Sequence, residues 1–235
     1  MKRLFILILV ILLFGCQMKS GEISLVTDDN VKISGDLLVG GGYQPLKNEK
    51  PDGEKYDVAV ILLHNLGSNK KIYKEFSSFL NSKGFTTLAI DFRGHGGSGG
   101  NVGDYSSYLK DVTAAKKFLK EKGYTQIYLV GGSIGANVAV RSAVDNDVQR
   151  ILLLSPGLNY KGITVLDVVN EYRGELYILS PESNQEEIKF AVTLKDYYLG
   201  TKKIRPESMT NEHGDKIVEE KNEDIYATLL WFLTK

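Results

Sequence analysis

The stretch at 129–136, LVGGSIGA, places one serine between glycines directly after an apolar run. Residues 131–135 fit the pattern G-x-S-x-G, in which the serine lies on a sharp turn from a strand into a helix. The flanking glycines give the strained backbone the room that it needs. We therefore expect Ser133 to project from the end of a strand as a nucleophile. The amide of Ile134, at the start of the helix, would point to where a developing oxyanion lies.

Short apolar runs alternate with amphipathic segments around this motif. The runs at 57–63, 86–90, 127–130, 151–154 and 176–179 predict strands, the first of them buried on both faces. Helices are predicted at 72–80, 105–119, 133–143, 165–172 and 186–198, with a last helix from about residue 215. A hairpin over 23–39 and a strand near 203–207 complete the pattern. This order predicts an α/β fold, with a mostly parallel central sheet and helices on both of its faces.

The composition excludes several classes of function. Lys and Arg number 29, as do Asp and Glu, so the formal net charge is zero and no overall positive field attracts nucleic acid. Hydrophobic residues at 43% and charged residues at 25% are typical of a water-soluble globular protein. A chain of 235 residues suits one well-buried domain, and is too short for two ordinary domains with a leader besides.

The first 15 residues have the pattern of a leader. A basic start is followed by an apolar run at 4–14, which is shorter than the stretch of about 18 to 20 residues that spans a bilayer. The run ends in LFGC at 13–16, which resembles the lipobox of bacterial lipoproteins, although Phe14 stands where that pattern has a small or β-branched residue. The resemblance implies lipidation of Cys16, a tether at 16–21 and a single domain over 22–235. It also implies an exported protein that is lipid-anchored to a bacterial membrane or cell surface; a secreted protein with an incidental cysteine is the alternative.

Three loops that follow predicted strands carry a family resemblance. They read HNLG at 64–67, DFRGHGGSGG at 91–100 and GGSIG at 131–135, and SPGLNYKG at 155–162 adds a fourth segment. In this order they resemble the α/β-hydrolase family, in particular its small, lidless dienelactone-hydrolase-like and serine-esterase members. The resemblance implies that the amide of Leu66 is a second oxyanion donor and that His64 and His95 brace the loops. Asn65 stands where the family usually has glycine.

The same resemblance implies a catalytic triad in the chain order serine, acid, histidine. The base is then His213, in TNEHGDKIV at 210–218, between the last predicted strand and the last helix. The acid should follow the strand at 176–179, where the family's usual aspartate would align with Ser183 and Glu182 is the neighbouring carboxylate. We therefore expect Glu182 to orient His213, with Asp196 and Asp215 as alternatives.

The expected reaction is hydrolysis of carboxylic esters, or of thioesters, through an acyl-enzyme on Ser133. His64, Asn65, Leu158 and Tyr160 are expected at the substrate site. Only about 20 residues separate Ser155 from Glu175, where relatives insert a cap. We therefore expect an open and shallow site that accepts small-molecule or short-chain esters. A membrane-tethered enzyme could also reach lipid esters. One cysteine and no H-E-x-x-H motif give zinc hydrolysis no support, and no metal or organic cofactor is expected.

Two other interpretations fit parts of the sequence. A dinucleotide fingerprint formally fits Gly94-x-Gly96-x-x-Gly99, but the next apolar helical pattern begins too far on for Gly99 to open it, and no acidic residue follows the next strand. The second alternative is an anchored binding protein with a degenerate hydrolase fold, motivated by the uncertain acid. The sequence makes no prediction about oligomeric state.

Overall fold

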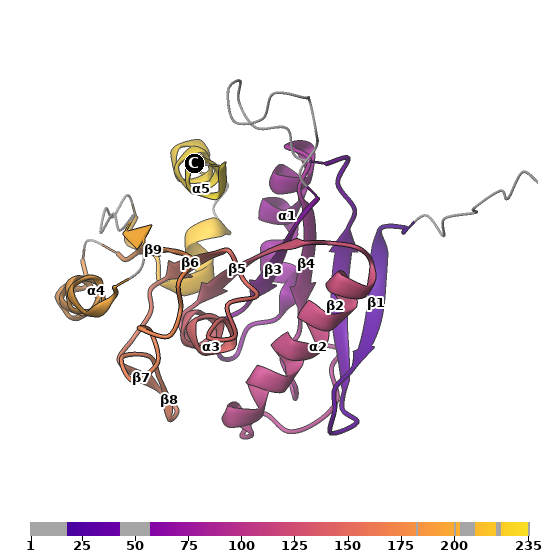
Figure 1. The fold of residues 1–235 in the computed structure, drawn as a ribbon, viewed down its shortest axis with the longest axis horizontal. Helices are drawn as coiled ribbons and strands as arrows, with labels where there is room; N and C mark the ends of the chain where they lie inside the picture. Colours follow the sequence, from indigo (N-terminus) through magenta and orange to yellow (C-terminus); the bar gives the residue numbers. More distant parts are fainter. Residues whose placement is uncertain are drawn as a thin grey trace, which may run out of the picture.

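The buried apolar runs form the centre of an eight-stranded sheet in the computed structural model, which describes residues 18–42, 57–181, 183–199, 201–202, 210–219 and 222–234. The strand order is β1-β2-β4-β3-β5-β6-β9-β10 (Figure 1). The strands are β1 (Gly21–Val26), β2 (Lys32–Leu38), β3 (Val58–Leu63), β4 (Thr86–Ile90), β5 (Gln126–Gly132), β6 (Arg150–Leu154), β9 (Glu175–Leu179) and β10 (Thr201–Lys202). The hairpin of β1 and β2 is antiparallel and β2 pairs antiparallel with β4, whereas the strands from β4 to β10 run parallel.

Both faces of the sheet are apolar because consecutive residues of the central strands point to opposite sides. In β3, Ala59, Ile61 and Leu63 belong to one buried cluster, whereas Val58, Val60 and Leu62 belong to the other. The first face is covered by α2 (Tyr108–Glu121), α3 (Ile134–Ser142) and α4 (Gln185–Tyr197), and the second by α1 (Lys74–Ser82) and α5 (Glu223–Thr234). Figure 1 shows α1 and α5 on one side of the sheet and α2 and α3 on the other. The predicted α/β architecture is confirmed.

The carboxyl ends of four neighbouring parallel strands are level with one another. Leu63 at the end of β3 pairs with Gly131, Gly132 of β5 pairs with Leu154, and Leu154 pairs with Leu179 at the end of β9. The loops after β3, β5, β6 and β9 therefore start side by side at one edge of the sheet, where open α/β sheets bind their ligands.

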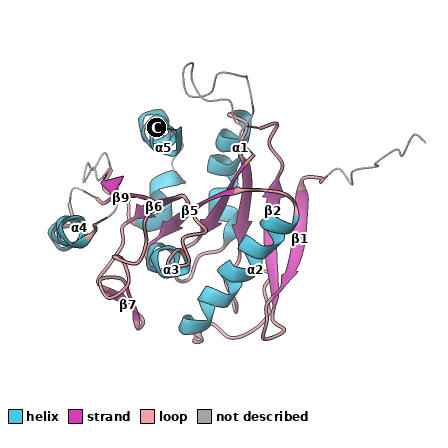
Figure 2. Cartoon of the chain, in the orientation of Figure 1, coloured by secondary structure: helices cyan, strands magenta, loops and turns pink. Residues whose placement is uncertain are grey.

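Two predicted elements differ in the structure. Residues 166–171 form turns rather than a helix, and a small hairpin of β7 (Asn159–Tyr160) and β8 (Ile163–Thr164) precedes them in the long connection from β6 to β9 (Figure 2). The predicted last helix is in two parts, a 3₁₀ helix η3 (Gly214–Val218) and α5, which begins at Glu223. The strand predicted near 203–207, the leader at 1–15 and Cys16 lie outside the described residues. Among the residues described, no helix combines the length and the apolar character needed to cross a bilayer.

Candidate active site

Ser133 has the strained backbone that the motif predicts. It lies between β5 and α3 with φ 51° and ψ −115°, a conformation that side-chain-bearing residues rarely adopt and that costs on the order of 1–3 kcal/mol. The turn is held because the amide of Ser133 donates to the carbonyl of Leu154 on the neighbouring strand, at 2.8 Å. The surrounding sheet thus fixes the serine at the carboxyl edge, with 9% of its surface exposed.

The glycines of the motif are required by close backbone contacts. A Cβ atom on Gly131 would lie 2.2 Å from the carbonyl oxygen of Gly135, and one on Gly135 would lie 2.4 Å from that of Leu63. A Cβ on Gly132 would lie 2.4 Å from the amide nitrogen of Asp215. Such contacts leave no room for any side chain, so these positions let the start of α3 pack onto the end of β3 and let the segment at 213–215 reach the serine turn.

Two backbone amides at this edge have no acceptor among the described residues. In the loop after β3, Asn65 donates to Asp215 at 2.7 Å, Gly67 faces Nε2 of His95 at 3.5 Å and Ser68 donates to the carbonyl of Asn65 at 3.2 Å. The amide of Leu66, in the same loop, has no hydrogen-bond acceptor among the described residues. The amide of Ile134 is the first of α3 and so has no intrahelical acceptor either. Both amides are available to an oxyanion.

His64 supports the loop from beneath. Its Nδ1 donates to the carbonyl of Asn65 at 2.6 Å and its Nε2 accepts from the amide of Phe92 at 3.0 Å. Burial lowers the pKa of His64 to about 4, so the ring is neutral, as these two bonds require. Because the side chain is fully buried and both nitrogens are occupied, His64 is a brace as expected, but it does not contact substrate, contrary to the prediction that grouped it with the substrate site.

Asn65 and Asp215 tie the loop after β3 to the segment that carries His213. The amide of Asn65 donates to Oδ2 of Asp215, and the amide of Asp215 donates to the side-chain oxygen of Asn65 at 3.2 Å. Glycine, which the family usually has at position 65, has no side-chain oxygen to accept from the amide of Asp215. Burial raises the pKa of Asp215, and the hydrogen bond from the amide of Asn65 partly offsets that effect. Asp215 therefore acts in a clamp and is not the acid of a triad.

His213 lies beside the serine turn. The residue after it, Gly214, donates its amide to the hydroxyl of Ser155 at 3.0 Å, and Ser155 directly follows β6. Asp215 packs against Gly132, the residue before Ser133. Ser133 and His213, which are 80 positions apart in the chain, are thus brought to the same edge by contacts of their immediate neighbours. The imidazole is partly open to solvent, with 41% of the side chain exposed.

The carboxylate that contacts His213 is Glu187. Its Oε1 lies 2.8 Å from Nδ1 of the imidazole. Burial opposes the charged form, but hydrogen bonds from His213 and Ser155 outweigh it and hold the pKa of Glu187 below its usual range. Glu187 is therefore a buried, ionised acceptor that fixes the orientation of the ring.

The structure favours Glu187 as the acid over Glu182, the residue expected from the sequence. Glu182 lies outside the described residues, and the position against Nδ1 is occupied by Glu187, in the first turn of α4. The other alternative, Asp196, is exposed on the same helix. A sequence signal existed: Asn184 and Glu187 have the spacing of a helix N-cap and a carboxylate three residues later.

Tyr160 and Leu158, two further residues expected at the substrate site, lie in the connection that follows β6. Tyr160 is on the small hairpin; burial raises the pKa of its phenol, and a hydrogen bond with the hydroxyl of Ser133 partly offsets that effect. Leu158 is 56% exposed and Leu66 is 39% exposed, each in a loop at the carboxyl edge of the sheet. These two leucines are apolar surface that an acyl or alcohol group could cover.

Comparison with known proteins places this geometry in a family. Residues 54–198, more than half of the chain, match the family described as serine aminopeptidase, S33. The chain belongs to this family of α/β hydrolases. The match and the sheet confirm the predicted fold and place the chain among the serine hydrolases; the dienelactone-hydrolase-like subgroup stays a prediction.

The relatives of this S33 hydrolase carry esterase names. The chain is 25% identical to a putative esterase/lipase of Mycoplasma pneumoniae over 170 residues, which are 69% of this chain and 61% of that one. It is 26% identical to a carboxylesterase of Bacillus subtilis over 144 residues, covering 57% and 56%. These matches span less than two thirds of each relative. The fold is similar to that of an esterase from Pyrococcus furiosus, with TM-score 0.71, 23% identity and coverage of 92% of this chain and 90% of that one.

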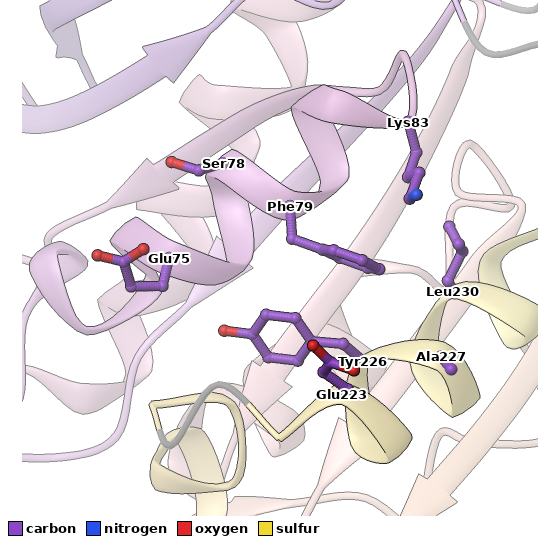
Figure 3. A pocket seen from close by; sticks show the side chains of 8 residues that line it. All are labelled: Glu75, Ser78, Phe79, Lys83, Glu223, Tyr226, Ala227 and Leu230. Atoms are coloured by element: carbon purple, nitrogen blue, oxygen red, sulfur yellow. The ribbon is translucent and has the colours of Figure 1, made fainter.

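A groove of about 630 Å³ on the S33 hydrolase lies between α1 and α5, as Figure 3 shows. Phe79 and Tyr226 form its floor, with Lys83, Glu75 and Glu223 around them. None of its lining residues belongs to the serine site described above. Both helices cover the face of the sheet opposite α3, so the groove is separate from the catalytic edge.

Proposed function

We propose that this S33 hydrolase is a membrane-anchored serine hydrolase that cleaves carboxylic esters, with thioesters as a related substrate class. The observation that carries the proposal is the hydrogen bond between Glu187 and His213, beside the strained Ser133. The alternative of a degenerate binding protein was motivated by an uncertain acid, and Glu187 supplies one. The esterase names of its relatives support the same reaction class.

The proposed mechanism assigns one step to each group. Ser133 Oγ attacks the carbonyl carbon and passes its proton to Nε2 of His213, while Glu187 holds Nδ1 and stabilises the imidazolium. The oxyanion accepts from the amides of Leu66 and Ile134, each worth about 10²- to 10³-fold in kcat. The imidazolium then protonates the departing alcohol, which leaves an acyl-enzyme on the serine. Water, deprotonated by the same imidazole, hydrolyses that ester and releases the acid.

We expect a preference for short acyl groups. The connection from β6 to β9 consists of residues 155–174 and contains only the small hairpin of β7 and β8, so this connection forms no cap over the acyl site. In a closed tunnel each buried methylene would contribute about 0.8 kcal/mol, or about fourfold in kcat/KM. We predict that kcat/KM for p-nitrophenyl acetate and butyrate exceeds that for octanoate and palmitate. A steady rise with chain length would contradict an open site, and no hydrolysis of any of the four would favour the binding-protein alternative.

The proposed anchor is a diacylglyceryl group on Cys16, at the end of the leader. Two or three acyl chains, each stabilised by about 0.8 kcal/mol per buried methylene, would hold the hydrolase at a membrane surface. We predict that the full chain, expressed in a bacterium fed labelled palmitate, incorporates the label and sediments with membranes. Cys16→Ser should lose both properties while Ser133-dependent hydrolysis persists. Equal labelling of the variant would contradict the anchor and leave the esterase proposal standing.

A further inference from the structure

Glu187 is held by a second donor besides the histidine. The side-chain nitrogen Nδ2 of Asn184 lies 2.6 Å from Oε1 of Glu187, the same oxygen that accepts from His213. A glutamate is a long side chain, and ordering its rotamers costs on the order of 1.5–2 kcal/mol. Two donors that converge on one oxygen restrict the carboxylate to the place where it meets Nδ1.

The orientation of the Asn184 amide is set by the helix that it caps. Its side-chain oxygen accepts from the amides of Glu186 and Glu187 at 3.2 and 3.3 Å, as an N-cap residue does. With the oxygen facing the helix, the nitrogen is the atom left to face the carboxylate. Aspartate or serine at position 184 could cap α4 equally well, but neither supplies an amide donor at that place.

We propose that Asn184 is a positioning residue for catalysis, which holds Glu187 on His213 through its side-chain nitrogen in addition to capping α4. This inference rests on the proposed function, because it assumes that the pair of Glu187 and His213 works on Ser133. Asn184 acts through Glu187 and touches no reacting atom.

Other charged and titratable groups face the same pair. Tyr160, from the small hairpin, interacts electrostatically with Glu187, and Asp215 interacts with His213 from the clamp. Ser155, directly after β6, lowers the pKa of Glu187. Substitution of residue 184 removes none of these groups, so a change in the pH dependence of Asn184→Ser reports the lost amide donor.

The test compares Asn184→Ser and Asn184→Asp with the unmodified chain. Both variants keep a good cap, so Tm should change by no more than about 4 °C. Each loses the donor to an ionised carboxylate, so kcat should fall about 10- to 100-fold. Asn184→Asp also adds a negative charge beside the imidazolium and favours its protonated form. The acidic limb of the kcat/KM profile should therefore move to higher pH in Asn184→Asp, and to lower pH in Asn184→Ser, where the carboxylate is held less firmly on the ring and no charge is added.

The chain offers a matched control at Asn222. Its side chain caps α5 in the same way, accepting from the amides of Asp224 and Ile225 at 3.0 and 3.2 Å. Asn222→Ser and Asn222→Asp should change Tm as the variants at 184 do, with no change in kcat or in the pH profile. If the variants at 184 behave like those at 222, Asn184 is only a cap and the proposal is overturned.

A readout that needs no turnover separates this inference from the proposed function. The chain has three histidines, so ¹⁵N-histidine NMR can follow the ring of His213 alone. In the unmodified chain we expect a downfield Nδ1 proton, which should weaken in both Asn184 variants. An unmodified chain that hydrolyses no ester would overturn the proposed function. An Nδ1 signal unchanged by either substitution at 184 would overturn the positioning role even if the esterase activity were established.

Discussion

Ser133→Ala is expected to lower kcat for p-nitrophenyl acetate by about 10⁶-fold, the loss that follows removal of the nucleophile in a serine hydrolase. The reason is that no acyl-enzyme can form, although the oxyanion amides and substrate binding remain. These remaining groups should leave a rate about 10³- to 10⁴-fold above that of the uncatalysed reaction. Steady-state kinetics on highly purified chain, with burst amplitude as a second measure, provides the test.

The control for this substitution is Ser78→Ala, on an exposed position of α1. It removes the same hydroxyl far from the catalytic edge and should leave kcat unchanged. Ser133→Ala should retain a Tm within about 4 °C, since the backbone contacts of the turn do not involve the hydroxyl. A variant that is folded and hydrolyses the ester as fast as the unmodified chain would show that Ser133 is not the nucleophile.

Glu187→Gln is expected to lower kcat about 10⁴-fold with little change in KM. The substitution keeps the shape of the side chain and removes its charge. An amide can present its NH₂ group to Nδ1, which favours the wrong tautomer of His213, and it no longer stabilises the imidazolium. The acidic limb of the kcat pH profile should move to lower pH, because the imidazolium loses the carboxylate that stabilises it.

Two neighbouring glutamates make matched controls for this prediction. Glu186→Gln changes an exposed residue of the same helical turn, and Glu182→Gln changes the residue that the sequence indicates as the acid. Both should keep kcat within about twofold of the unmodified chain, because the proposed mechanism assigns the contact with His213 to Glu187. A large loss in Glu182→Gln with none in Glu187→Gln would restore the original assignment and overturn the one made from the structure.

The serine turn was predictable because local backbone geometry dictates its sequence. Gly131 and Gly135 lie where any Cβ would meet a carbonyl oxygen, so the motif itself carries the constraint. The same holds for the strands: a run such as VAVILL in β3 must be buried on both faces, which indicates a parallel sheet with helices on both sides. Where a constraint is local, the residues alone specify the structure.

The acid was not predictable by the same reasoning. The family resemblance implies a carboxylate in the turn directly after β9, but the chain continues to the N-cap at Asn184 and reaches His213 from the first turn of α4. The contact spans 26 residues in sequence, and nothing in the local pattern of either segment specifies it. The clamp of Asn65 and Asp215 joins segments 150 residues apart and was missed for the same reason.

The hairpin of β7 and β8 and the split of the last helix have a different cause. Both depend on how the connections pack. Asn137 of α3 donates to the carbonyls of Gly157 and Ile163, which holds the hairpin against the helix. At the C-terminus, Ile217 and Val218 of η3 fill the cluster beneath α1 and α5, so the chain turns inward before α5 begins. Tertiary packing here overrides the periodicity of the sequence.

The most direct test of the account is intact-mass and peptide-mass analysis of the chain after treatment with a fluorophosphonate. Such a probe phosphonylates a serine only when a neighbouring base activates it. We predict a gain of one phosphonyl group, located on Ser133, which is lost in Ser133→Ala and slowed strongly in Glu187→Gln. An unlabelled chain, or a label on another residue, would contradict the claim that Ser133, His213 and Glu187 form one catalytic unit.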